Sequence, residues 1–196
     1  QGNNVRDQAG DWALFEELSS APATMEAGKA VDAYGCVEGH ICQQADGTSA
    51  YTQALLGGVA TCVRLPHDRW PKHWANKYHD PVTPLRLALY GHPDAGGYWE
   101  KHCESHIKSE GFKVIPDWRS VYWHNELKVL LIVYVDDFKM SGTKGNLKQG
   151  WDSVRQRIAI EPPAPLGVFL GCDRQRVTVQ LSSGVVARGV EYCTKG

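Results

Sequence analysis

The sequence predicts an α+β fold, in which an antiparallel sheet has helices packed on one face. One reason is the run LLIVYVDDFKM at 130–140, which is typical of an interior strand. A second is the amphipathic segment at 145–160, which indicates a helix. A third is that strand-like and helix-like segments are mixed without repeats along the 196 residues, a length that suits one domain over 1–196.

The N-terminal part of the chain predicts a helix followed by a strand. The segment 19–35 indicates the helix, with Ser20 as its N-cap and Gly35 as its end. The segment 36–46, CVEGHICQQAD, alternates in polarity and predicts a strand that ends at Asp46.

The middle of the chain predicts further short elements. The segment 61–66 indicates a strand, and 67–84 indicates an irregular excursion because it contains three prolines. An apolar stripe at helical spacing predicts a helix over 94–112. The segment 119–140 predicts two strands with a turn near His124.

The C-terminal part predicts a helix and then strands. The helix at 145–160 places four apolar residues on one face: Leu147, Trp151, Val154 and Ile158. After the proline-rich EPPAP, the segment 166–192 indicates strands joined by tight turns.

Composition limits the classes of function. Hydrophobic residues make up 42% of the chain, which suffices for a core, while a net charge of -1 gives no overall attraction to nucleic acid. A nucleic-acid partner would therefore have to meet a local patch. No apolar stretch approaches the ~20 residues that a membrane helix needs, and no secretion signal opens the chain. We therefore expect an intracellular protein with no membrane partner and with its six cysteines reduced.

Two adjacent carboxylates, Asp136 and Asp137, interrupt the apolar run at 130–140. Burying like charges side by side is unfavourable, and a pair of divalent cations would remove the repulsion. Such a site needs a third acid from another element, and Asp46 at the end of the strand 36–46 is the best candidate. The alternative is a solvated turn at a strand end, although the apolar residues on both sides of the pair fit it poorly.

Several blocks of the chain, in order, resemble the reverse transcriptase segment of a copia-type retrotransposon polyprotein. QGNNVRDQAG at the start and LFEELSSAPATMEAGKAVDAYGC at 14–36 resemble the segment that leads into the family's first helix. DGTSAYTQALLGG at 46–58 resembles the first catalytic block, and LALYGHPDAGGYW at 87–99 resembles the second. LIVYVDDF at 131–138 is nearly identical to the third block. VRLP at 63–66 and VFLGC at 168–172 resemble the strand after the first block and the block that grips the primer.

The resemblance implies a right-hand polymerase palm with partial fingers and RNA-directed DNA synthesis. Asp46, Asp136 and Asp137 match the catalytic acids that hold two Mg²⁺ or Mn²⁺ ions. Tyr51 matches the aromatic residue beneath the nucleotide sugar, which excludes a 2′-hydroxyl. Asp94 stands near the nucleotide where the family normally has Gln, and it also suits the N-cap of the helix 94–112.

The resemblance also implies partners and further contacts. The residues expected from it to contact primer or template are Tyr134, Phe169, Leu170 and Gly171. Lys148 is expected to face phosphate for a separate reason, because it stands near the start of a helix, where a cation gains nothing from the helix dipole. The expected partners are an RNA or DNA template with its primer, deoxynucleoside triphosphates and the remainder of a polyprotein, in a cytoplasmic particle or the nucleus. By the family pattern, the upstream fingers and the thumb lie largely outside 1–196.

Two other classes of function remain open at this point. A metal-dependent nuclease or another phosphoryl transferase could share the three acids, but it would not need the Ala50-Tyr51 pair. A catalytically inactive retroelement relic, or a nucleic-acid-binding module, is favoured by Asp94. Magnesium binding separates the relic from both enzymes.

Overall fold

The computed structural model describes residues 5–7, 9–13, 22–74 and 76–194. The chain divides into two compact units, of which one comprises 1–19 and 51–99 and the other 20–50 and 100–196. The predicted N-cap Ser20 lies outside the described residues. The part of the chain that is described contains no helix whose length and hydropathy would suit a membrane span.

Helices and strands are mixed, as an α+β fold requires. In chain order the elements are α1 (Met25–Gly35), β1 (His40–Asp46), η1 (Ala50–Gln53), β2 (Cys62–Arg64), η2 (His67–Arg69), β3 (Val82–Pro84), α2 (Ala95–Ser109), β4 (Phe112–Ile115), β5 (Trp118–His124), β6 (Val129–Tyr134), β7 (Asp137–Thr143), α3 (Lys144–Arg155), β8 (Ala164–Pro165), β9 (Cys172–Gln180) and β10 (Val186–Thr194).

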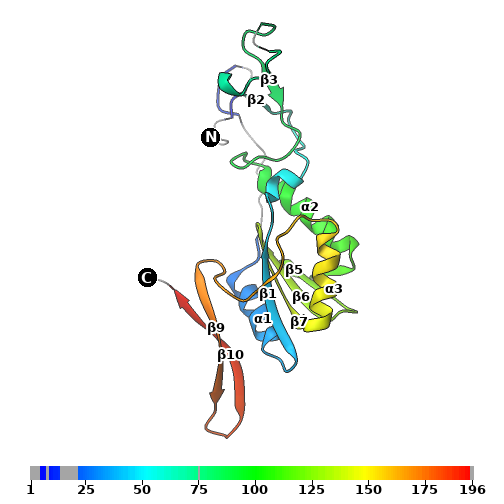
Figure 1. Ribbon diagram of the computed structural model, residues 1–196, viewed down its shortest axis with the longest axis vertical. Coiled ribbons are helices and arrows are strands. Elements are labelled where there is room, and N and C mark those ends of the chain that lie inside the picture. The colour runs from blue at the N-terminus through cyan, green and yellow to red at the C-terminus, as the bar shows by residue number, and fades with distance from the viewer. Residues whose placement is uncertain (1–4, 8, 14–21, 75, 195–196) are drawn as a thin grey trace. The chain divides into compact units, whose positions relative to one another are not determined.

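The larger unit is built on an antiparallel sheet with strand order β4-β5-β6-β7-β1-β8 (Figure 1). The predicted segment 119–140 forms three strands instead of two, because the chain reverses between Tyr134 and Asp137. Strands β9 and β10 form a separate two-stranded hairpin. In the smaller unit, β2 and β3 pair as a short hairpin within the segment predicted to be irregular.

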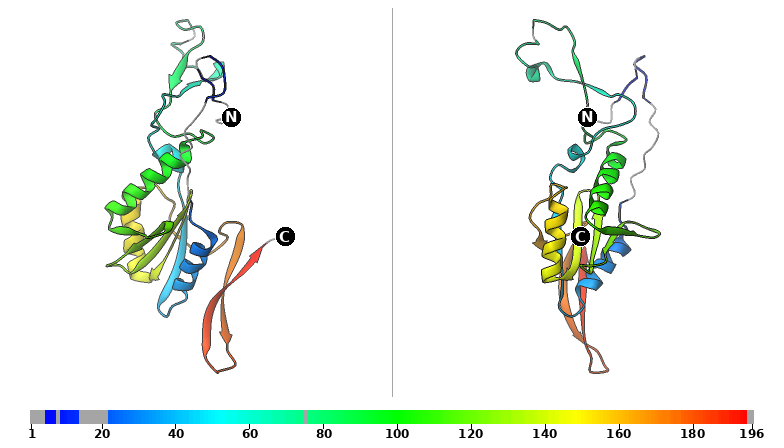
Figure 2. Two further views of the ribbon diagram at one scale, coloured as in Figure 1. Left: turned by 180° about the vertical axis from the view of Figure 1, so that it is seen from behind. Right: turned by 90° about the vertical axis from the view of Figure 1, so that its right-hand side faces the viewer.

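The helices of the larger unit cover both faces of the sheet, so the prediction of helices on one face is wrong. Successive residues of a strand point to opposite faces. Lys139 of β7 pairs with Asp32 of α1, whereas its neighbour Met140 lies against Gly150 of α3. The views in Figures 1 and 2 agree, with α1 and α3 on opposite sides of the sheet.

The first helix begins later than the sequence predicts. Its N-cap is Thr24, whose hydroxyl accepts a hydrogen bond from the Ala27 backbone N–H at 3.2 Å. The helix ends at Gly35 as predicted, where a Cβ would lie 2.9 Å from the Cβ of Cys42.

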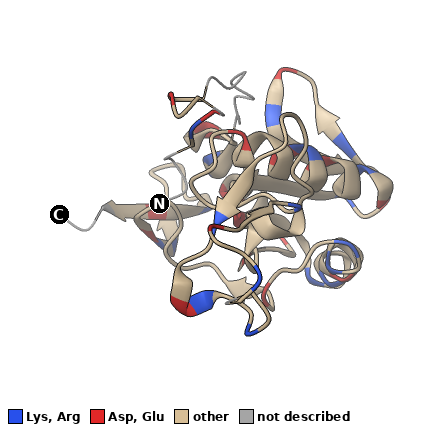
Figure 3. Ribbon diagram, turned by 90° about the horizontal axis from the view of Figure 1, so that it is seen from above, with Lys and Arg blue, Asp and Glu red and all other residues tan. Residues whose placement is uncertain are grey.

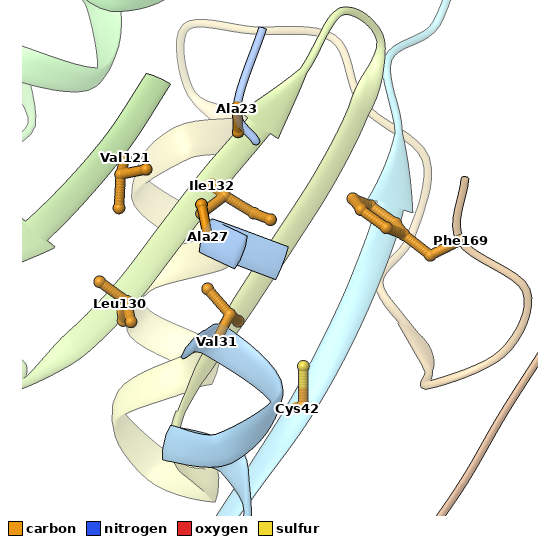
Figure 4. Close-up of a cluster of buried hydrophobic side chains, with 8 residues drawn as sticks. All are labelled: Ala23, Ala27, Val31, Cys42, Val121, Leu130, Ile132 and Phe169. Carbon is orange, nitrogen blue, oxygen red and sulfur yellow. The ribbon is translucent and has the colours of Figure 1, made fainter. Parts of the chain in front are cut away.

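Apolar side chains of α1 pack on the sheet and form one part of the core. Figure 4 shows the buried cluster, which draws residues from α1 and the segment before it, from three strands and from the segment before β9: Ala23, Ala27, Val31, Cys42, Val121, Leu130, Ile132 and Phe169. On the opposite face, Leu147, Trp151 and Val154 of the predicted stripe are buried on α3, whereas Ile158 is buried beyond it, because the helix ends at Arg155 and not at 160. The sheet is therefore buried on both faces, which explains the continuous apolar run of β6.

Candidate active site

The sheet register brings the three acids together at one end of the larger unit. Asp46 is the last residue of β1 and stands directly opposite Asp137, the first residue of β7, which in turn stands opposite Tyr134 of β6. Directly opposed residues point to the same face, so Asp46 and Asp137 are neighbours. Asp136 precedes Asp137 in the turn, and its carbonyl accepts a hydrogen bond from the Gly47 N–H at 2.6 Å.

The turn that presents the acids has an unusual backbone. Val135 has a φ of 57°, a left-handed conformation that is unfavourable for a β-branched residue. Such a conformation costs of order 1–3 kcal/mol and is typical of functional turns. Across the sheet, a Cβ on Gly47 would lie 3.2 Å from the Asp136 carbonyl oxygen, so glycine permits the close approach of β1 to this turn. The turn lies at Val135-Asp136, so Asp137 is already the first residue of β7.

The carboxylates of the site repel one another. Burial first of all, and then the charges of Asp136 and Asp46 and a side-chain hydrogen bond with Asp46, together raise the pKa of Asp137 to about 6, while the Arg174 charge acts in the opposite direction. An unusually high carboxyl pKa at a strand end is a feature of functional sites. The site therefore holds more negative charge than its surroundings neutralise.

The three carboxylates are suitable ligands for a hard divalent cation, although their side chains are not arranged as a coordination sphere. Among the described residues, no group of three or more His, Cys, Asp or Glu side chains is arranged to hold a metal ion. Asp46 and Asp137 nevertheless stand opposite each other in the sheet register, with Asp136 next to Asp137 in the turn. Carboxylate oxygens are the ligands that Mg²⁺ and Mn²⁺ prefer, and a cation would relieve the repulsion that raises the pKa of Asp137.

The two residues expected to contact the nucleotide belong to the smaller unit. The Tyr51 ring packs against the Tyr90 ring, with centroids 4.4 Å apart. Asp94 is buried, and its Oδ1 has no hydrogen-bond partner among the described residues. At the start of α2, the Asp94 backbone carbonyl accepts a hydrogen bond from the Tyr98 N–H, at 3.1 Å.

The residues predicted to contact primer or template lie in different surroundings. Tyr134 lies in the same cross-strand row as the acids. Phe169 is a core residue with 3% exposure, and the next two residues form a tight turn, with φ of 52° at Leu170 and 73° at Gly171. The Phe169 ring is packed inside the protein, and the contact of this residue with primer or template stays a prediction.

Lys148 is not brought to the acids. It lies on α3, on the opposite face of the sheet, and pairs with Asp152 at 2.6 Å in an exposed contact. Figure 3 shows α3 nearly end-on with its basic segments in blue. A primer bound over the acids would be separated from Lys148 by the sheet.

A buried ionic cluster beside the acids is not predicted by the sequence. Asp32 of α1 binds Lys139 Nζ through Oδ1 at 2.5 Å, and its Oδ2 accepts from the Tyr192 hydroxyl at 2.8 Å and lies 3.2 Å from Arg174 Nε. Lys139 and Arg174 both lie about 4.7 Å from the centroid of the Phe169 ring, within cation–π range. One signal was available: Lys139 sits between buried Phe138 and Met140 in a strand covered on both faces.

Comparison of the chain with models of known protein families finds no match, and comparisons with curated proteins and with solved structures find none either. A functional assignment therefore depends on the geometry of the chain and on the sequence blocks described above.

Proposed function

We propose that the chain is the palm segment of a retroelement reverse transcriptase, an RNA-directed DNA polymerase. The observation that carries the proposal is the register of the sheet, in which Asp137 stands opposite Asp46, an acid from a distant part of the sequence. Two-metal nucleotidyl transfer requires acids from different elements to converge in this way.

Two further features support the proposal. The acids are presented by a turn with Val135 at positive φ, and strained backbone of this kind is found at functional sites. The sequence blocks that resemble the copia-type enzymes also occur in the order of that family, and the block LIVYVDDF contains the turn itself.

In this proposal, Asp46, Asp136 and Asp137 would hold two Mg²⁺ or Mn²⁺ ions, which supply Lewis acidity for attack by a primer 3′-oxygen and for departure of pyrophosphate. The chain's own contribution is positioning. The Gly47 N–H fixes the turn through the Asp136 carbonyl, and pairing along β7 fixes Asp137 against Asp46. The resemblance implies that Tyr51 selects deoxyribonucleotides over ribonucleotides.

Primer extension tests the proposal, with the chain expressed within the polyprotein reading frame. Asp136→Asn removes a ligand charge and should reduce extension on a primed RNA template by at least about 10³-fold while the fold is kept. Asp152→Asn is the matched control, because it removes an exposed carboxylate on the other face of the sheet. Extension by Asp136→Asn equal to that of the Asp152→Asn control would remove the proposal.

An inactive relic or nucleic-acid-binding module is the second candidate. The observation in its favour is that no group of three metal-binding side chains is arranged to hold an ion among the described residues. A relic need not bind magnesium. A chain that binds a primed template and takes up neither Mg²⁺ nor Mn²⁺ at millimolar concentration would favour this candidate.

A further inference from the structure

A cavity of about 320 Å³ lies in the larger unit, between the edge of β1 and the first half of β9. Strand β8 pairs with β1 only at Gln43 and Gln44, so no described strand covers the edge of β1 at Ile41 and Cys42, where the cavity lies. The charged residues that line it are Arg174 and Arg176, two positions apart on one face of β9.

Arg174 is buried without the hydrogen bonds that a guanidinium normally makes. Its exposure is 5%, and neither Nε nor Nη1 has a hydrogen-bond partner among the described residues. The nearest carboxylate oxygen, Asp32 Oδ2, is 3.2 Å from Nε but is off the hydrogen-bonding direction and is already bound by the Tyr192 hydroxyl. Burying a guanidinium without hydrogen-bond partners costs free energy, so an anion that accepts hydrogen bonds from Arg174 would be stabilised here.

The buried charges next to the cavity are unbalanced. Asp32 is the one carboxylate in contact with two buried cations, Lys139 and Arg174, among the described residues. These three side chains therefore leave one positive charge over, at the wall of the cavity. The Arg174 charge also lowers the pKa of Asp137.

A second cavity of about 230 Å³ adjoins the first, because Arg176 lines both. It adds Arg188 of β10 and His40 of β1. None of the described residues that line either cavity is an Asp or Glu. Three arginines therefore surround two neighbouring cavities whose described lining contains no carboxylate. In a chain of net charge -1, this is a local excess of positive charge.

We propose that these neighbouring cavities bind phosphate-class oxyanions, with Arg174 and Arg176 as the primary ligands and Arg188 as a further ligand in the second cavity. Guanidinium groups match phosphate oxygens in a bidentate geometry, and two cavities that share an arginine suit two linked phosphoryl groups. Those groups occur in pyrophosphate and in successive nucleotides of a nucleic-acid strand. The site is separate from the three acids and needs no metal.

Binding is tested with the 196-residue chain in buffer that contains a chelator, so the outcome does not depend on the proposed polymerase activity. The probes are inorganic phosphate, pyrophosphate and a short oligothymidylate, with chloride at equal ionic strength as the reference. Arginine side-chain NMR signals report the site directly. We expect pyrophosphate to bind with a dissociation constant of about millimolar or tighter and to shift the Arg174 Nε–H signal.

The test variant is Arg176→Gln, because Arg176 is exposed and its hydrogen bond to the Gly35 carbonyl, at 3.3 Å, is not needed for the core. It should weaken pyrophosphate binding by about tenfold through loss of a bidentate contact. Arg119→Gln on β5 is the matched control, since it removes the same charge from an exposed position outside both cavities.

The outcomes separate the sources of the phosphoryl groups and can overturn the proposal. Pyrophosphate binding that Arg176→Gln weakens assigns the site to free phosphates, and oligothymidylate binding with the same sensitivity, without pyrophosphate binding, assigns it to a nucleic-acid strand. Equal losses in Arg176→Gln and Arg119→Gln, or no binding of any probe, would overturn it.

Discussion

Two charge clusters lie on one face of the main sheet and differ in sign and in burial. At the end of β1 and β7, Asp46 and Asp137 crowd together with no cation in direct contact among the described residues. Further inside, Lys139 and Arg174 share the single carboxylate of Asp32, and all three side chains are almost completely buried.

The interior cluster has a structural role that the acidic cluster lacks. The interior cluster ties α1, β7, β9 and β10 together through direct contacts of Asp32, so its charges hold tertiary structure. The acidic cluster makes no comparable link within the described part of the chain, and like charges in contact oppose folding. Charges that destabilise the fold and lie beside a strained turn are better explained by a ligand than by stability.

The largest expected effect is on the interior cluster. Asp32→Asn leaves Lys139 and Arg174 buried without a counter-charge, so the free energy of unfolding should fall by about 3–5 kcal/mol. Urea denaturation followed by circular dichroism measures this loss. A loss below about 1 kcal/mol would show that the cluster does not hold the elements together.

The acidic cluster should respond in the opposite sense. Asp137→Asn removes a repelled carboxylate, so it should raise the free energy of unfolding of the metal-free chain by about 1 kcal/mol at pH 7, an amount already reduced for solvent screening. Urea denaturation of the parent and the variant in chelator-containing buffer measures the difference.

The sign follows from the raised pKa of Asp137. Because the pKa is about 6 in the folded state and 3.8 for an ordinary Asp, the folded state binds the proton more tightly. Stability from this group is therefore full below pH 3.8 and is lost as the pH rises through about 6. The advantage of Asp137→Asn over the parent should grow between about pH 5 and pH 7.5. An advantage that shrinks over this range would contradict burial and carboxylate repulsion as its cause.

The smallest effect is expected on the other face of the sheet. Lys148 and Asp152 are exposed partners at i, i+4 on α3, so Lys148→Ala should change the free energy of unfolding by no more than about 0.5 kcal/mol. The same variant should leave binding of a primed template unchanged, because the sheet separates α3 from the acids. A tenfold loss of primer binding, measured by fluorescence anisotropy, would restore Lys148 as a substrate contact.

The sequence predicts the elements that present the acids because their signals are local. The apolar run before Asp136 and the alternation before Asp46 define two strands, and the stripe that includes Val154 defines α3. The sequence predicts that Asp46 and Asp137 lie together only because a metal site would require it. The register that pairs them depends on contacts between distant segments, which the sequence pattern does not show.

The rest depends on tertiary packing that periodicity does not encode. An amphipathic stripe shows which side of a helix is buried but not which face of the sheet the helix covers. The sequence therefore does not show that Lys148, predicted to contact primer or template, lies on the face opposite the acids. Asp32 and Arg174 look like ordinary surface charges, and their burial follows from the position of the β9–β10 hairpin against α1. Thr24 replaces the predicted cap because it stands directly before the first helical residue.

The most direct test of the central claim is Mn²⁺ binding by the 196-residue chain, followed by electron paramagnetic resonance. If Asp46, Asp136 and Asp137 form a metal site, the parent should bind Mn²⁺ at millimolar concentration or below, and each single Asp→Asn variant should bind at least about tenfold more weakly. Asp152→Asn should bind as the parent does. Equal Mn²⁺ affinity in the parent and in Asp136→Asn would contradict the claim that this turn is a metal-dependent active site.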